Sequence, residues 1–287
     1  MQAIRSILVV MTPNQPEALA LKRAKLIAGV THSRLHLLVC DKRDEHGEYL
    51  AKIAQELKED GYEVTTEQAW HESFHQTIIQ AQQAESCGLV IKQHFPENPL
   101  KRALLTPDDW KLLRYCPSPV LIAKTKRPWT EGSILAAVDV GNSSAEHKAL
   151  HASLINNAFE VAAIAKATLH VLTAHPSPML SASDPTFQLR ETIEARYREQ
   201  CAKFIKEYEL TDEQMHIKEG PADVLIPQMA SELDAVVTVI GTVARTGLSG
   251  ALIGNTAEVV LDAVETDVLV LKPESVMIHL ETPLERK

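Results

Sequence analysis

Short apolar runs alternate along this chain with longer stretches whose apolar residues recur every three or four positions. In the second half, residues 134–138, 169–173 and 236–240 are short apolar runs typical of buried strands. Residues 145–166 and 190–208, between those runs, have helical spacing. Continuous apolar strands that alternate with helices indicate a parallel sheet covered on both faces. The pattern predicts an α/β fold with a doubly wound sheet.

The same pattern occurs twice. Residues 6–11 resemble 133–138, and residues 119–124 resemble 267–272. From Gln76 and its counterpart Val224 onward, the offset between the copies is constant, so no insertion separates them there. We therefore expect two open, twisted, five-stranded parallel sheets that form a pseudo-dimer within one chain. It is too short an array to be a many-repeat solenoid.

A polar stretch containing proline and glycine, residues 125–132, separates the two copies. It predicts a first domain over residues 1–126 and a second over residues 127–287. The length of 287 residues agrees with two domains of ordinary size.

Composition narrows the functional classes. The net charge is −9 and no long basic cluster is present, which disfavours nucleic acid as a partner. No apolar run approaches the roughly 20 residues of a membrane span, and the N-terminus lacks a signal-peptide pattern. The four cysteines have no paired spacing. We expect a cytoplasmic protein with reduced thiols, no membrane association and no nucleic-acid partner.

A possible phosphate loop is present in the second copy alone. Gly241 ends a strand-like run, Ala244 follows, and Gly254-Asn-Thr256 opens a helical stretch. A helix N-terminus offers free N–H groups and the positive end of the helix dipole to an anion. The alternative is that Gly241 only makes a strand-end turn and that Asn255 or Thr256 only caps the helix. This is not a Walker loop, because no Gly-Lys-Ser/Thr follows.

Residues 241–258 and 267–273 resemble the universal stress protein family in its tandem form, and residues 105–120 resemble the first half of such tandem members. The resemblance covers nearly the whole chain. It implies the strand order 3-2-1-4-5 in each half and pairing of the halves through their last strands. The nucleotide-binding branch of the family carries the motif Gly-x2-Gly-x9-Gly-Ser/Thr. Gly241 and Gly254 match it, whereas Ala244 and Asn255 depart from it.

The resemblance also implies a set of ligand-binding positions and an adenine nucleotide, ATP, as the ligand. The base and ribose would lie near Ala137, Val138, Asp139 and Val171, and the phosphates near Ile240, Gly241, Ala244, Gly254, Asn255 and Thr256. Ala244 puts ATP in question if that position needs a positive φ, since a Cβ there costs about 1–2 kcal/mol.

The first copy has lost these features. Thr12 stands where the second copy has Asp139, and Gln93, Pro96 and Thr106 stand at the three loop positions. We expect no nucleotide binding of the family type in the first copy.

His71-Glu-Ser-Phe-His75 matches the HExxH string of zinc hydrolases, in which both histidines lie on one helix. The repeat aligns Ser73 with Pro221, which places His71 before the helix begins. A catalytic zinc is therefore disfavoured, and no catalytic residue is assigned. A non-catalytic zinc site formed by His71, His75 and His94 is more plausible than a catalytic one. The competing interpretation is that these three residues are exposed polar histidines in loops.

Two functions remain. The first is a stress-response regulator that binds an adenine nucleotide or another phosphorylated ligand in the second copy, with at most slow ATP hydrolysis. The second is an interaction module that binds protein partners or an apolar, acyl-type small molecule. Because the expected pairing of the last strands uses the edges through which single-domain relatives would pair, we expect a monomer or a weak dimer.

Overall fold

The computed structural model describes residues 4–13, 15, 18–43, 45–95, 105–142, 144–178, 189–242, 255–273 and 277. Its first half runs β1 (Ser6–Met11), α1 (Leu19–Thr31), β2 (Arg34–Cys40), α2 (Gly47–Glu59), β3 (Val64–Ala69), α3 (Phe74–Ala84), β4 (Leu89–Gln93), α4 (Pro107–Tyr115) and β5 (Val120–Ala123).

The second half runs β6 (Ser133–Val138), α5 (Ala145–Ala165), β7 (Thr168–His175), α6 (Arg190–Glu207), a short 3-10 turn (Asp212–Gln214), β8 (Met215–Glu219), α7 (Ala222–Glu232), β9 (Ala235–Gly241), α8 (Asn255–Ala263) and β10 (Asp267–Leu271). Pro221 stands immediately before α7, where its missing N–H costs no helical bond.

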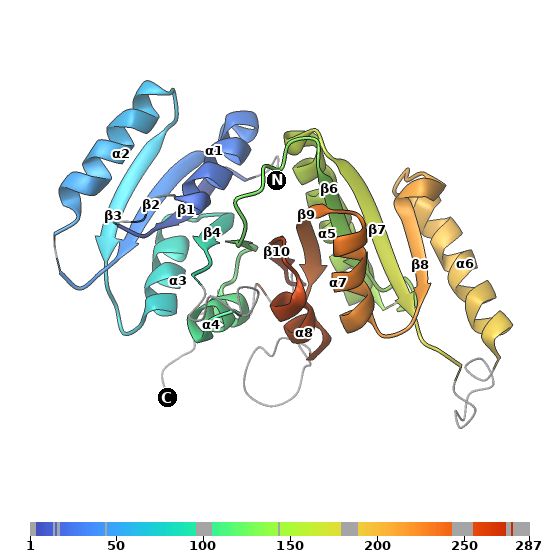
Figure 1. Ribbon diagram of the computed structural model, residues 1–287. Coiled ribbons are helices and arrows are strands. Elements are labelled where there is room, and N and C mark those ends of the chain that lie inside the picture. The colour runs from blue at the N-terminus through green and yellow to red at the C-terminus, as the bar shows by residue number, and fades with distance from the viewer. Residues whose placement is uncertain are drawn as a thin grey trace.

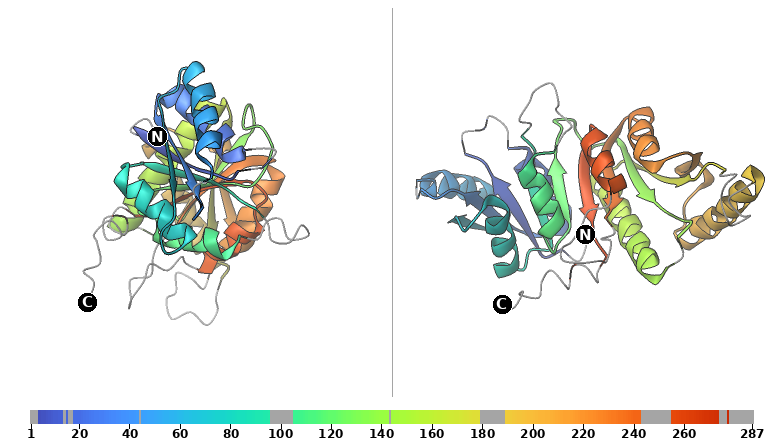
Figure 2. Two further views of the ribbon diagram at one scale, coloured as in Figure 1. Left: turned by 90° about the vertical axis from the view of Figure 1, so that its left-hand side faces the viewer. Right: turned by 90° about the horizontal axis from the view of Figure 1, so that it is seen from below.

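The strands form one ten-stranded sheet with the order β3-β2-β1-β4-β5-β10-β9-β6-β7-β8. Each half is parallel within itself and follows the order 3-2-1-4-5, which confirms the predicted α/β fold. The halves meet where β5 and β10 pair antiparallel, with Leu121 opposite Leu269. Figure 2 shows this junction at the centre of the molecule, with the halves extending to either side. The predicted pairing through the last strands is thus present.

Two hydrophobic layers enclose the sheet. Helices α1, α2, α5 and α6 cover one face of the sheet, and α3, α4, α7 and α8 cover the other (Figure 1). The buried apolar side chains of these two sets of helices belong to two separate clusters. The direction of winding reverses between β1 and β4 in the first half and between β6 and β9 in the second. In such sheets the crevice for a ligand lies at this reversal, at the carboxyl ends of the strands.

A buried carboxylate joins the halves. Asp267 is fully buried and accepts hydrogen bonds from Arg23 Nε at 2.6 Å, from Trp129 Nε1 at 2.8 Å and from the N–H groups of Lys124 and Thr125 at 2.8 and 2.9 Å. A buried charge is tolerated only when it is paired in this way. Asp267 therefore connects β10 to the first helix and to the segment that follows β5.

Two matched lysines reach across the same junction. Lys124 follows β5 and donates to the carbonyl oxygen atoms of Leu261 and Val264 at the end of α8, at 3.0 and 2.7 Å. Lys272 follows β10 and donates to the carbonyl oxygen of Cys116 at the end of α4, at 2.7 Å. Each half thus caps the last helix of the other.

Candidate functional site

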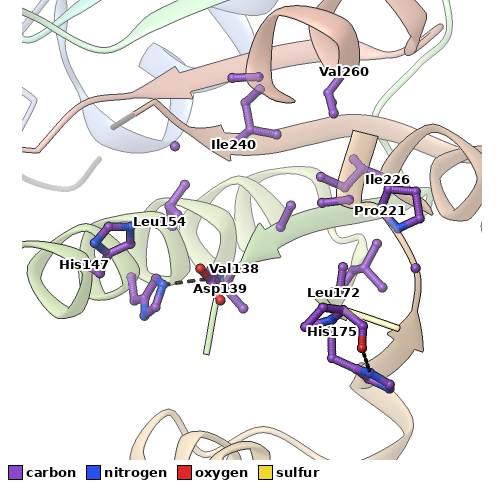
Figure 3. A pocket seen from close by; sticks show the side chains of 18 of the residues that line it. Val138, Asp139, His147, Leu154, Leu172, His175, Pro221, Ile226, Ile240 and Val260 are labelled. Carbon is purple, nitrogen blue, oxygen red and sulfur yellow. Dashed lines mark hydrogen bonds between the residues drawn. The ribbon is translucent and has the colours of Figure 1, made fainter. Parts of the chain in front are cut away.

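A cavity of about 900 Å³ lies at the reversal point of the second half. The carboxyl ends of β6 and β9 border it, together with residues of β7 and of α5, α6, α7 and α8. Among the residues expected at a ligand site, Ala137, Val138, Asp139, Ile240 and Gly241 line this cavity. Figure 3 shows Ile240 and Val260 on one wall and Asp139 and His147 across from them.

The two walls differ in chemistry. Leu172, Ile226, Ile240 and Val260 make the wall beneath α7 and α8 apolar. The opposite wall carries polar groups that the sequence analysis did not name: His147, His151, His175 and Tyr197. The sequence held one signal for them, because His147 and His151 are four residues apart and therefore share one face of α5. No lysine or arginine lines the cavity within the described part of the chain.

Asp139 stands exposed at the end of β6, and the chain turns around it. Its Oδ1 accepts from the N–H of Gly141 at 3.1 Å, and its own N–H donates to Nε2 of His151 at 3.3 Å. Because Nε2 accepts, it carries no proton in this arrangement. Burial lowers the pKa of His151, and the nearby carboxylate of Asp139 only partly opposes that shift. Among the described residues no hydrogen bond engages the other carboxylate oxygen of Asp139, which borders the cavity beside the imidazole of His151.

Gly241 lies at the edge of the cavity and close to Leu150 of α5. A Cβ at this position would lie 2.7 Å from Cδ2 and 3.1 Å from Cγ of Leu150 on α5. The glycine therefore lets the end of β9 lie against α5 at the edge of the cavity. The contact with Leu150 is consistent with a purely structural role for Gly241. Its position on the cavity wall is consistent with a ligand-binding role, so both interpretations remain open.

The remaining expected residues are placed differently. Val171 is fully buried in the core on the α5 and α6 side, and its neighbours Leu172 and Ala174 line the cavity instead. Ala244 and Gly254 lie outside the described residues. Asn255 and Thr256 begin α8, and Ala257 in the same turn borders the cavity. The first turn of α8 is therefore beside the cavity, as an anion site would require.

At the matched point of the first half, the chain fills the space with its own charges. Asp109 on α4 is fully buried and accepts from Lys92 Nζ at 2.5 Å and from the N–H of Thr106 at 3.0 Å. Its other contact is Nδ1 of His94, at 2.9 Å. Burial alone raises the pKa of Asp109, but these hydrogen bonds and the charge of Lys92 outweigh it and hold the pKa well below its usual range.

Gln93, the counterpart of Gly241, also turns inward. Its Oε1 accepts from the N–H of Leu19 at 2.9 Å and so satisfies the first turn of α1. The side chain at the position of Gly241 is therefore bonded to the chain's own α1.

The three histidines considered for zinc do not converge. α3 begins at Phe74, so His71 precedes the helix, as the repeat predicted. His75 lies against Tyr115 with 6.1 Å between ring centroids and contacts Ser73 Oγ at 3.0 Å, while His94 is held by Asp109. Within the described residues, the metal-ligand group of three that the structure offers is a different one, Asp41, Glu45 and His46.

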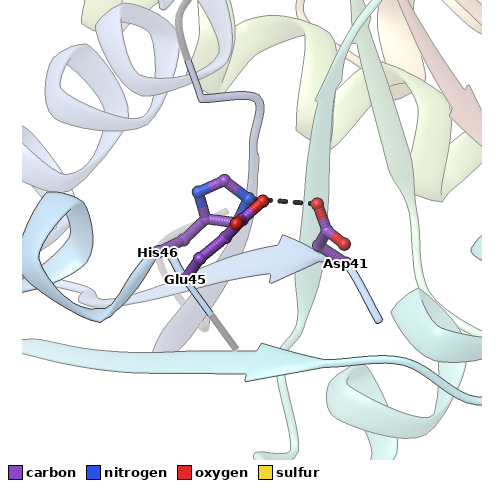
Figure 4. A group of neighbouring side chains, drawn as sticks. All are labelled: Asp41, Glu45 and His46. Carbon is purple, nitrogen blue, oxygen red and sulfur yellow. Dashed lines mark hydrogen bonds and ion pairs between the residues drawn. The ribbon is translucent and has the colours of Figure 1, made fainter. Parts of the chain in front are cut away.

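That group lies in the loop between β2 and α2 (Figure 4). His46 Nε2 is 3.0 Å from Asp41 Oδ2, and Arg43 pairs with Glu45 at 3.2 Å and with Asp41 at 3.7 Å. Arg43 offsets part of the negative charge of the two carboxylates, so the residues of the loop form an ion-pair network with one another.

A smaller cavity of about 220 Å³ shares His175 with the large one. Its arginines are paired: Arg190 contacts Glu219 at 2.6 Å and Glu194 at 3.0 Å, and Arg198 contacts Glu194 at 3.1 Å. These arginines are therefore paired with carboxylates of the same chain.

None of the described helices has the length and apolar character of a membrane-spanning segment.

Comparison with known proteins agrees with this architecture. The sequence model of the universal stress protein family matches residues 132–272, the half that holds the large cavity. Universal stress protein E of Salmonella typhi is 30% identical, with 99% of this chain and 98% of the relative aligned. The crystal structure of a universal stress protein from Pseudomonas aeruginosa UCBPP-PA14 is 68% identical and superposes with a TM-score of 0.91, covering 98% of this chain and 97% of that one.

A universal stress protein from Archaeoglobus fulgidus DSM 4304 shares the fold at 17% identity, with a TM-score of 0.64 over 94% of this chain and 99% of that one. The full-length match to the Salmonella relative, the family match in the second half and the shared tandem arrangement lead to one conclusion: the chain belongs to the universal stress protein family.

Proposed function

We propose that this protein is a cytoplasmic stress-response regulator that binds an adenine nucleotide, or another phosphorylated small molecule, in the cavity of its second half. The observation that carries the proposal is the position of that cavity, between the carboxyl ends of β6 and β9 and beside the first turn of α8. This is where doubly wound sheets bind ligands and where a helix N-terminus favours a phosphate.

Each part of a nucleotide has a matching surface. The apolar wall of Leu172, Ile226 and Val260 suits a base. The free carboxylate oxygen of Asp139 suits a ribose hydroxyl, which can donate to it. The N–H groups of α8 suit the phosphates. With no lysine or arginine on the described cavity wall, transferred phosphate charge has little stabilisation, so any ATP hydrolysis would be slow.

The test is isothermal titration of ligand-stripped protein with ATP and Mg²⁺. The expected result is micromolar binding with one site per chain. Gly254→Val should abolish it while the unfolding transition stays unchanged, because a branched side chain would cover the N–H groups of the loop. If the protein gives neither heat nor a thermal shift with the nucleotide, or Gly254→Val binds as well as the parent, the proposal fails.

A second ligand class has its own support. The apolar wall and the absence of a described lysine or arginine on it also suit an acyl-type molecule. Mass spectrometry of whatever co-purifies with the protein separates the two: a nucleobase with phosphate supports the first proposal, and an acyl species supports the second. The first half, closed by its own charges, would act as a scaffold in either case. Because β5 and β10 occupy each other's edges, we expect a monomer or a weak dimer.

A further inference from the structure

Two histidines face each other at the outer edge of the sheet, away from the large cavity. His170 lies on β7 and His216 on the edge strand β8, and His216 pairs directly with Leu172. Since side chains two residues apart share one face of a strand, His170 and His216 are diagonal neighbours on the same face. Nδ1 of His170 is 3.1 Å from Nε2 of His216, and both rings are half-buried.

We propose that His170 and His216 bind one divalent transition-metal ion of the Zn²⁺, Cu²⁺ or Ni²⁺ class, which clips β8 to β7. Zinc lies about 2.0–2.1 Å from an imidazole nitrogen, so two nitrogen atoms 3.1 Å apart would subtend about 100° at the ion. This angle is close to the tetrahedral value. The ion would replace the hydrogen bond between the two rings, and it would lie about 40° away from the line that joins the two nitrogen atoms, so both rings would turn to direct their lone pairs at it. Water would complete the coordination.

The chemistry of the pair favours this class of ion. Imidazole suits zinc, copper and nickel, whereas calcium and magnesium prefer oxygen ligands. Coordination needs an unprotonated nitrogen with its lone pair available on each of the two facing rings. Half-burial leaves a route for the ion.

The first half shows that this pair is a specific arrangement. His36 occupies the place of His170, and Glu67 pairs with Leu38 just as His216 pairs with Leu172. There Nε2 of His36 is 3.1 Å from Glu67 Oε2, and Nδ1 is 2.8 Å from Thr65 Oγ1. Both nitrogen atoms of His36 have oxygen partners, so that half completes its hydrogen bonds without an ion. In the second half, Nδ1 of His170 is hydrogen-bonded to Nε2 of His216, so the partner of the histidine is a second imidazole nitrogen, which is itself a possible metal ligand.

The experiment is a titration of the full chain with ZnCl₂, after treatment with a chelator and buffer exchange. One site per chain is expected. Loss of an outer partner of a metal ligand already costs about 10–100-fold in affinity, so His170→Gln and His216→Gln should each weaken binding by at least about tenfold. His71→Gln changes an exposed histidine of the first half and should leave the affinity unchanged. Zinc should also raise the melting temperature of the parent and not that of His216→Gln.

Unchanged affinity in both pair variants would overturn the proposal. So would loss of the site in His46→Gln, because the ion would then belong to the loop of Asp41, Glu45 and His46. Should a pair variant fail to fold, electron paramagnetic resonance of the parent with one equivalent of Cu²⁺ decides the question. Hyperfine splitting from two imidazole nitrogens supports the site, and splitting from fewer than two overturns it.

Discussion

The direction of winding reverses once in each half of the sheet. The backbone follows the same path at both reversal points, but the side chains at one border a cavity and those at the other are bonded to one another. In the second half, Ile240, Gly241 and Ala257 border an open cavity. In the first half, the positions matched to them carry Lys92, Gln93 and Asp109. Lys92 pairs with Asp109, and Gln93 accepts a hydrogen bond from the backbone of α1, so both charges among these three residues are paired. The same fold thus either leaves its crevice open to a ligand or closes it with side chains.

In the first half, an acidic side chain lies at the helix end that corresponds to the first turn of α8. Asp109 supplies the negative charge that the end of a helix attracts, at the N-terminal turn of α4 and within a capping box with Thr106. Lys92 and His94 then hold this carboxylate from the strand side. Under the proposed function, Asp109 holds in the first half the position that a ligand's phosphate would hold in the second, and a group that belongs to the chain loses no entropy of association.

The largest expected effect comes from removing that internal anion. Asp109→Ala leaves the buried ammonium of Lys92 without its charge partner, and breaking a buried pair costs about 3–5 kcal/mol. Urea unfolding measures the change. Asp108→Ala, one residue earlier in the same turn, should cost less than about 1 kcal/mol because only the helix-dipole interaction is lost.

Added phosphate sharpens this test. With Asp109 gone, Lys92, His94 and the N–H groups of α4 form an anion site, so inorganic phosphate should restore part of the stability of Asp109→Ala and do little for the parent. An equal response of both proteins would show that Asp109 does not stand in for an anion.

Closing the open site is the next largest change. Gly241→Gln gives the second half the residue found in the first, and its Cβ would meet Leu150. We expect nucleotide affinity to fall at least about 100-fold, or about 2.7 kcal/mol, as measured by calorimetry. The matched control is Gln93→Gly, which removes the hydrogen bond to Leu19 and leaves the pairing of Lys92 with Asp109 intact. It should leave one binding site per chain and cost about 1 kcal/mol through the lost bond to Leu19. A second site in that variant would contradict the account.

Restoring the second glycine of the family motif should have a smaller effect. Ala244→Gly, outside the described residues, completes the second glycine of the loop. If the loop needs a positive φ there, affinity for ATP with Mg²⁺ should rise about tenfold, or about 1.4 kcal/mol. An unchanged dissociation constant would mean that the backbone at Ala244 has a negative φ.

The smallest effect concerns a feature in which the halves agree. Burial lowers the pKa of Lys272 to about 8, and burial likewise lowers that of Lys124 to about 8 against the opposing charges of nearby carboxylates. A lysine whose pKa is lowered on folding binds its proton less readily in the native state, so the free energy of unfolding should rise with pH between about 8 and 10.5. Lys124→Met and Lys272→Met should each reduce that slope by about 1 kcal/mol per pH unit. Equal slopes in parent and variants would contradict it.

The repeat and its apolar runs were enough to predict two copies of a doubly wound α/β sheet, whereas the strand order and the pairing through the last strands came from the family resemblance. The repeat also placed His71 before α3, because Ser73 aligns with Pro221. The two sheets and this helix start follow from local periodicity and from the constant offset between the copies. For the site, Ala137, Val138, Asp139, Ile240 and Gly241 were anticipated by the family resemblance, and they line the cavity.

Other features depend on contacts between distant residues and could not be predicted. Arg23 and Asp267 are 244 positions apart, and nothing in either local sequence names the other. The strand-end lysine Lys92 was a visible anomaly in an apolar run, but only the fold shows that Asp109 meets it. Tyr197 borders the cavity from α6, a helix whose spacing was visible in the sequence but whose contact with the cavity was not.

The junction also sets an order on synthesis. A ribosome releases the first half well before β10, and until then the edge of β5 stays bare and Arg23 lacks the carboxylate that it pairs with in the finished protein. The first half therefore completes its packing only when nearly the last residue of the sheet has emerged. A truncated chain would keep an open strand edge and a buried arginine without its partner, features that favour aggregation and degradation.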